Sequence, residues 1–403
     1  MQISNKKKSL IRAAGGGGLL LIGKSVVDNI FVRGRADPNA YATVDGTAVA
    51  FIIYTLICVI FCFSYFQKRN NYSILAELCR TTPLKWFVIY SAIALISSIW
   101  SVNSVLSGYR AVECFAIAGV MLAALIEAMR TGGRRFTIEW VCFYVSLVSV
   151  MSLLRRFSYV GFNSWILQSS QMLATVFFYF ALLASRKKIY KIIIGALSIF
   201  SCSTTSYIGM ALGSTCLFRS KNKIPAFILC VTVAVGMFFW GPEKFIKETV
   251  FSQREEMSWE NSSGRDRMLE QVWEGFCEAP VLGYGFFAGE VYVMRMHDIG
   301  AMVTNAHSSF GSAALGTGIL GLIPMTAFIV GAFLLINSRR IPKEYSAAFA
   351  GSFWVALAHC CGNPSVGSKV YGAWIGVMLL IMTAAVFSMP EDRFYVLTNG
   401  DER

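Results

Sequence analysis

Residues 307–337 read HSSFGSAALGTGILGLIPMTAFIVGAFLLIN, a run that contains no Asp, Glu, Lys or Arg. A helix needs about 20 mostly apolar residues to cross the hydrocarbon core of a bilayer. This run is therefore long enough to span a membrane, and comparable runs separated by short basic loops fill most of the chain. The pattern predicts an all-α polytopic membrane protein.

The composition of the whole chain agrees with this prediction. Of its 403 residues, 55% are hydrophobic and 15% are charged, against roughly 45–50% and about 25% in an ordinary soluble domain. The mean hydropathy is +0.56, so a single soluble core would leave much apolar surface in water. The eleven cysteines are scattered through apolar stretches and are expected to be small buried hydrophobes rather than a disulfide framework.

The apolar runs predict about twelve transmembrane helices. The expected spans are 14–31, 45–66, 85–101, 111–129, 137–154, 165–185, 190–203, 206–218, 225–241, 307–337, 345–361 and 369–389. The stretch 190–218 has two interpretations, because it fits either a tight hairpin of two short helices or a re-entrant pair.

The net charge of +13 is interpreted differently in a soluble protein and in a membrane protein. In a soluble protein it would favour nucleic-acid binding, whereas in a membrane protein Lys and Arg accumulate in cytoplasmic loops. Most basic residues here lie in alternate short loops. The alternation places both termini in the cytoplasm, provided that 190–218 crosses the membrane an even number of times, and we expect no nucleic-acid partner.

The predicted spans and loops divide the chain into four parts. Residues 1–241 hold about nine spans, 242–305 form one large outer loop, 306–389 hold three spans, and 390–403 form a cytoplasmic tail. The outer loop has six basic and eleven acidic residues. It is too short for an independent domain of ordinary size, so we expect it to form a helical cap over the membrane part.

Two familiar patterns are set aside on physical grounds. Gly18, Gly23, Lys24 and Ser25 fit the phosphate-binding loop pattern G-x-x-x-x-G-K-[ST], but that loop must join a buried strand to a helix, and here it lies inside an apolar run. Lys24 and Asp28 are four residues apart, so they are expected to form an intramembrane pair. The three histidines lack the spacing of metal ligands, and the sequence predicts neither a metal site nor a cofactor.

The stretch 261–323 carries the most information about function. A predicted helix through Trp273 is followed by Pro280 and by a Gly283-x-Gly285 turn, and His307 then opens the span quoted above. This stretch resembles the O-antigen ligase and polysaccharide polymerase superfamily of bacterial inner membranes. The resemblance covers roughly residues 85–340, and its pieces are Trp100-Ser101-Val102-Asn103-Ser104, Ser263-Gly264-Arg265, Pro280-Val281-Leu282-Gly283-Tyr284-Gly285, and His307 with Gly318-x-x-Gly321.

The resemblance implies a metal-independent inverting glycosyltransferase in the bacterial inner membrane, with the large loop in the periplasm. The donor would be an undecaprenyl-pyrophosphate-linked glycan and the acceptor a glycan or the lipid A core, with the bilayer and polysaccharide assembly proteins as further partners. The sequence does not distinguish a ligase from an O-antigen or exopolysaccharide polymerase. Such a reaction needs a base near the attacking hydroxyl and cations at the leaving pyrophosphate.

Under this resemblance, His307 and Arg265 are the expected catalytic residues. Histidine titrates near neutrality, and a guanidinium gives planar bidentate contacts to phosphate. The expected substrate-binding residues are Arg267, Arg110, Asn305, Ser308 and Thr205. Thr205 belongs to Ser203-Thr204-Thr205-Ser206, in which Thr204 stands where family members carry a basic residue. Some pyrophosphate contacts must therefore come from elsewhere, or the substrate differs.

Three alternatives stay open at the level of sequence. A transporter or flippase of a lipid-linked substrate also fits twelve spans, although carriers with two six-span halves usually carry their longest loop in the cytoplasm. A metal-dependent sugar transferase could use Asp37, which a chelator would test. A non-catalytic assembly partner would explain the missing basic residue at Thr204.

Overall fold

The computed structural model describes residues 15–30, 46–160, 171–199, 201, 204–216, 265–296, 306–363 and 365–399. Within these ranges the ordered elements are helices, with no strand among them, which confirms the all-α prediction. Three helices there are long and apolar enough to cross a membrane, or up to five if each of two bent helix pairs counts as one span. The chain therefore has the helices of a membrane protein, while the count of twelve spans stays a prediction.

Nearly every described helix coincides with an apolar run of the sequence. These helices are α2 (Gly15–Ile30), α3 (Gly46–Phe66), α5 (Leu84–Ile96) with the short 3-10 helix η2 (Ser97–Ile99), α8 (Phe178–Ala184), α9 (Lys188–Ile199), α10 (Thr204–Ser214), α15 (Ser309–Ile336), α16 (Lys343–Gly362) and α17 (Gly372–Phe387). The predicted span 225–241 lies outside the described residues. Helix α17 is at the centre of the bundle, and all of its residues from Ala373 to Phe387 are buried.

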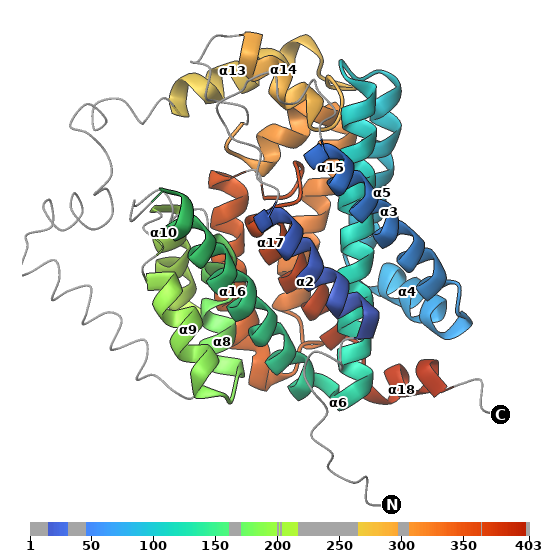
Figure 1. Ribbon diagram of the computed structural model, residues 1–403, viewed down its shortest axis with the longest axis vertical. Helices are drawn as coiled ribbons and strands as arrows, with labels where there is room; N and C mark the ends of the chain where they lie inside the picture. Colours follow the sequence, from blue (N-terminus) through green and yellow to red (C-terminus); the bar gives the residue numbers. More distant parts are fainter. Residues whose placement is uncertain are drawn as a thin grey trace, which may run out of the picture.

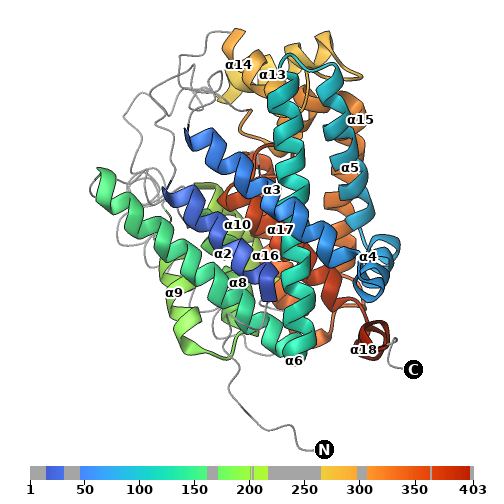
Figure 2. The ribbon, with the colours of Figure 1, turned by 45° about the vertical axis from the view of Figure 1, so that its right-hand side comes forward.

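The helix α6 (Ser104–Val160) is a hairpin with two arms. Gly132 and Gly133 have non-helical backbone angles, and the φ of +67° at Gly133 is a conformation that glycine adopts without a steric penalty. The first arm (104–131) descends through the molecule, and the second arm (134–160) rises away from it, in teal and green in Figures 1 and 2. The two arms hold the predicted spans 111–129 and 137–154.

Two helices form where the sequence analysis expected a loop and a tail. Helix α4 (Arg69–Thr81) meets α5 at 97°, and α18 (Glu391–Asn399) meets α17 at 92°. Helix α4 buries Asn71, Ile74 and Leu78 along one face. The two helices pack against each other and are joined by the ion pair between Arg393 and Glu77 at 3.0 Å. Within the predicted tail 390–403, residues 391–399 are therefore helical, and 400–403 lie outside the described residues.

The stretch 190–218 contains two short helices, as predicted, but they do not pair as a tight hairpin would. Helix α9 packs on α8 and α6, whereas α10 packs on α16. Glycine makes this last contact close, since a Cβ on Gly209 would lie 2.7 Å from the Val355 Cα atom.

The opposite end of the bundle from α18 is covered by α13 (Arg265–Glu278) and α14 (Ala288–Met296), drawn in gold and orange in Figure 1. A small apolar cluster of Val293, Met294, Ala306 and Leu315 joins these helices to the beginning of α15. The described part of the predicted cap thus consists of two helices joined by the turn 279–287, and it lies directly over the start of the span that opens at His307.

Candidate functional site

Three segments that are far apart in the sequence join beneath α13 and α14. The Trp100 indole donates a hydrogen bond to the Leu282 carbonyl at 3.0 Å, and the Tyr284 backbone N–H donates to the Leu315 carbonyl at 2.8 Å. The Ile319 N–H closes the arrangement by donating to the Pro280 carbonyl at 2.8 Å. The 100–104, 280–285 and 315–321 segments, which carry most of the family resemblance, therefore form one hydrogen-bonded unit, called here the motif junction.

Glycines allow the backbones of the motif junction to come this close. Gly283, Gly285 and Gly318 have φ of +63°, +104° and +59°, which side chains with a Cβ rarely adopt. A Cβ on Gly318 would lie 2.3 Å from the Val281 carbonyl oxygen, and one on Gly285 would lie 2.0 Å from Ser101 Oγ. The predicted Gly-x-Gly turn is thus a structural part of the junction.

Glu290 on α14 is fully buried beside this junction. Its Oε1 atom accepts hydrogen bonds from the Ala306 N–H at 2.7 Å and from Ser312 Oγ at 2.8 Å. Its Oε2 atom accepts one from Ser368 Oγ at 3.0 Å. Burial raises the pKa of Glu290 to about 7, although these three hydrogen bonds and the charge of Lys369 act in the opposite direction. One carboxyl group therefore connects α14, the start of α15 and the α16–α17 loop.

His307 follows Ala306 directly and lies at the point where α15 begins. It is half-buried and has a φ of +46°, in the left-handed region. Ser308 is the N-cap of α15, and its side chain accepts a hydrogen bond from the Gly311 N–H. Because Glu290 holds the N–H of the residue before His307, it fixes the backbone that presents the histidine. The structure thus brings two predicted residues, His307 and Ser308, together with an acid that the sequence analysis missed.

Arg110, an expected substrate-binding residue, is mostly buried in the structure. Its side chain is 19% exposed and pairs with the fully buried Glu113 at 2.7 Å. Glu113 also pairs with Lys24 at 3.2 Å, and Lys24 with Asp28 at 2.5 Å. These four residues form a buried charge cluster between α2 and α6 with two positive and two negative groups. The predicted Lys24–Asp28 pair is confirmed, and the position of Lys24 within continuous helix excludes a phosphate-binding loop there.

The buried charge cluster lies next to the Glu290 site. The Arg110 guanidinium is 5.2 Å from the centre of the Phe287 ring, at the start of the segment leading into α14. On the other side of Glu113, Cys114 Sγ contacts the Ser368 carbonyl at 3.4 Å, and the Ser368 hydroxyl bonds Glu290. Arg110 Nε is buried and has no hydrogen-bond partner among the residues that the structure describes. The cation Arg110 and the protonatable acid Glu290 therefore both lie close to the motif junction.

Thr205 lies beside a different polar network. A Cβ on Gly362 would lie 2.7 Å from Thr205 Oγ1, so the threonine packs against α16. The adjoining Ser206 and Thr175 hydroxyls lie 3.3 and 3.0 Å from His359 Nε2, and Asn363 Nδ2 lies 3.1 Å from His359 Nδ1. Because the amide nitrogen can only donate, the His359 proton is on Nε2. Ser309 Oγ donates to the Asn363 carbonyl at 3.2 Å and so links this network to α15.

Some predicted site residues fall outside the described part of the chain. Arg265 and Arg267 begin helix α13, but their side chains are not described, and Asn305 is not described at all. The described residues contain no group of three or more His, Cys, Asp or Glu side chains that could hold a metal ion.

The sequence contained one signal for the missed acid. Glu290 stands alone in the apolar segment from Phe286 to Val293, and an isolated acid in such a segment is costly to bury unless it has a structural or functional partner. Its hydrogen bonds reach residues 16, 22 and 78 positions away, and local patterns do not indicate contacts of that kind. No protein-family model matches the chain, and no curated protein matches it.

Proposed function

We propose that this protein is a glycosyltransferase that moves a glycan from an undecaprenyl-pyrophosphate carrier to a sugar hydroxyl on the outer face of the bacterial inner membrane. The motif junction is the observation that supports this proposal. Three of the segments of the family resemblance form one unit, and Glu290, whose neighbour Gly289 packs against that unit, holds the backbone N–H of Ala306 next to His307. The proposal includes the twelve-span topology with cytoplasmic termini and with residues 242–305 in the periplasm.

In the proposed reaction, the acceptor oxygen forms a bond to the anomeric carbon while the bond from that carbon to the pyrophosphate oxygen breaks. The pyrophosphate leaves with the electron pair, and attack from the opposite side inverts the anomeric configuration. His307 takes the proton of the attacking hydroxyl. Arg265, with Arg267, neutralises the charge that develops on the pyrophosphate. Glu290 fixes the backbone at residue 306, so it acts on the reaction by positioning His307.

The proposal is tested with purified full-length protein, a lipid-pyrophosphate glycan donor and a sugar acceptor, without added metal. His307→Ala and Arg265→Ala should each reduce transfer by at least about 100-fold while the protein stays folded. Arg295→Ala is the matched control, because it removes one exposed cation from the same loop, and it should keep transfer within about twofold. Turnover like that of the wild type in both of the first two variants would overturn the mechanism.

The acceptor class needs a separate experiment. A strain that lacks the gene should accumulate single repeats on the lipid carrier if the protein is a polymerase. It should accumulate long unattached chains if the protein is a ligase. Unchanged surface glycans would count against both.

The buried charge cluster favours a second candidate, a transporter or flippase. Ionisable residues inside a membrane bundle are rare and often line substrate pathways, and Lys24, Glu113 and Arg110 are such residues. A flippase would move the lipid-linked glycan across proteoliposomes without changing its covalent structure. Translocation without any glycan transfer would favour this candidate over the enzyme.

A further inference from the structure

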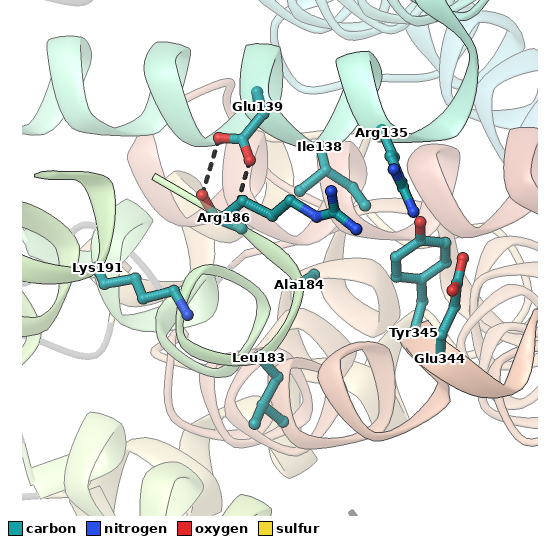
Figure 3. Close-up of a pocket in the computed structure, with 10 residues that line it drawn as sticks. Arg135, Ile138, Glu139, Leu183, Ala184, Arg186, Lys191, Glu344 and Tyr345 are labelled. Atoms are coloured by element: carbon teal, nitrogen blue, oxygen red, sulfur yellow. Dashed lines mark hydrogen bonds between the residues drawn. The ribbon is translucent and has the colours of Figure 1, made fainter. Parts of the chain in front are cut away.

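A cavity of about 380 Å³ lies at the end of the bundle that the basic loops predict to be cytoplasmic, far from the motif junction. Its wall comes from the second arm of α6, the α8–α9 link, α9 and the first turn of α16 (Figure 3). Ile138, Leu183 and Ala184 give it an apolar side. Ligand pockets usually measure about 300–1,000 Å³, so this cavity suits a ligand the size of a lipid headgroup.

The two acids of the cavity are already engaged. Glu139 accepts hydrogen bonds from Ser185 Oγ at 2.8 Å and from the Arg186 N–H at 2.7 Å, one on each oxygen. Glu344 lies beside Tyr345, next to the Arg135 guanidinium in Figure 3. Glu139 thus joins the second arm of α6 to the α8–α9 link.

Two cations that line the cavity have no such partner. In the ranges that the structure describes, neither the Arg186 guanidinium nor the Lys191 ammonium forms an ion pair or a side-chain hydrogen bond. Arg186 is exposed and Lys191 is half-buried. In Figure 3 the Arg186 side chain runs beneath α6 toward Arg135, and the Lys191 side chain extends from α9. Three cations, Arg135, Arg186 and Lys191, and two acids, Glu139 and Glu344, line the cavity, so the lining carries a formal charge of +1.

The backbone adds to this positive potential. The second arm of α6 starts after Gly133, α9 starts at Lys188 and α16 starts at Lys343. The first turns of these three helices border the cavity through Arg135, Lys191 and Glu344. Helix N-termini carry partial positive charge and unpaired N–H groups that favour anions. The cations, the helix starts and the apolar side together match a phosphate group that carries a short apolar extension.

We propose that this cavity binds a phosphate-bearing ligand through Arg186 and Lys191. The source of the phosphate is either an anionic phospholipid headgroup of the adjacent leaflet, which is rich in negative lipids on the cytoplasmic side, or a free phosphate ester. Both sources present the same group to the same two cations. The proposal is independent of glycosyl transfer, because it concerns the other end of the molecule.

Native mass spectrometry of the delipidated full-length protein tests the proposal. The probes are phosphatidylglycerol, phosphatidylcholine and glycerol phosphate. Arg186→Gln/Lys191→Gln should weaken binding of the phosphate probe by about tenfold or more. The matched control is Lys187→Gln/Lys188→Gln, which removes the same charge from two exposed neighbours that do not line the cavity, and it should change binding by about twofold or less.

The outcomes distinguish the two sources. Selective retention of phosphatidylglycerol with no effect of glycerol phosphate assigns the site to a lipid headgroup, whereas saturable glycerol phosphate binding assigns it to a free ester. Equal weakening in the cavity variant and the control would show general surface attraction and would overturn the proposal. Failure of every probe to bind the wild-type protein would overturn it as well. Thermal unfolding of both variants in detergent checks that the protein is folded.

Discussion

Glu290 makes the stability of the cap depend on pH. Its pKa is about 7 in the folded protein against an ordinary value of 4.5, so between these values the folded state holds a proton that the unfolded state has lost. Folding stability should therefore fall as pH rises from about 4.5 to about 7, by about 1.4 kcal/mol per unit, and level off above.

Glu290→Gln removes this titrating group while keeping the shape of the side chain. The variant should gain stability relative to the wild type as pH rises through that window, by a total on the order of 3 kcal/mol. Thermal unfolding of the two proteins in detergent, compared at several pH values from 4 to 8, measures the difference. If the stabilities of the two proteins changed in parallel with pH, Glu290 would not be protonated in the folded state between pH 4.5 and 7.

Gly318 is where a single methyl group should separate the segments of the motif junction. Gly318→Ala places a Cβ 2.3 Å from the Val281 carbonyl oxygen in a backbone with φ of +59°, so it should cost about 2–4 kcal/mol. Gly195→Ala is the control, because nothing lies within 4 Å of its Cβ in α9 and alanine favours a helix by about 0.5–1 kcal/mol. The two melting temperatures should move in opposite directions, and a harmless Gly318→Ala would contradict the close packing.

For single residues, the sequence indicated candidate positions but not the side chains that contact them. His307, Ser308 and the Gly283-x-Gly285 turn could be found because each belongs to a local pattern. The partners of Glu290 and Arg110 could not, since a carboxyl group that bonds Ser368 and an arginine that pairs with Glu113 depend on how helices pack. Thr205 was assigned to the substrate by its place in a pattern, and that assignment stays a prediction; in the fold the residue packs against Gly362.

At the scale of elements, hydropathy located α2, α3, α15, α16 and α17 to within a few residues, because burial in lipid or in the bundle requires long apolar runs. The same criterion missed α4 and α18. Each of these two helices buries one face only. Because their sequences are short and polar, a search for long apolar runs does not distinguish them from loops. An amphipathic spacing such as Asn71, Ile74 and Leu78 is the signal that could have found α4.

The attachment of α2 to α6 should depend strongly on the buried charge cluster. Lys24→Met removes both of the ion pairs that Lys24 forms, with Asp28 and with Glu113, whose side chain is 1% exposed. Breaking a buried pair from one side costs about 3–5 kcal/mol. Lys24→Met/Asp28→Leu, which restores the charge balance, should recover about half of that loss.

An exposed ion pair provides the comparison. Arg393→Gln breaks the contact between α18 and α4 at a side chain that is 50% exposed, and such pairs contribute about 0–1 kcal/mol. Thermal unfolding of the three variants in one detergent measures all of these changes. A Lys24→Met variant as stable as Arg393→Gln would mean that the buried charge cluster contributes little to holding α2 in place.

For the whole molecule, orientation is the property on which both proposals depend. Helix α13 covers one end of the bundle and α18 lies at the other (Figure 1), with the motif junction near the first. The basic loops predict that α18 lies in the cytoplasm, and the structure orders the two ends without assigning them to a side. The sequence therefore predicts on which side of the membrane each end of the bundle lies. The fold shows which residues lie at the same end.

Labelling of single-cysteine variants tests on which side of the membrane each end of the bundle lies. Cys277 on α13 is exposed, and Tyr395 on α18 is 42% exposed, so a cysteine at either position should react with a maleimide that cannot cross membranes. In intact spheroplasts the variant that retains Cys277 alone should be labelled at once, whereas Tyr395→Cys in a cysteine-free chain should react only after permeabilisation. The reverse pattern would place His307 in the cytoplasm, where no glycan could be transferred on the outer face, and labelling of both from outside would contradict the opposite-end arrangement. The expected pattern would place the Arg186 cavity beside the cytoplasmic leaflet and His307 beside the outer one, as both proposals require.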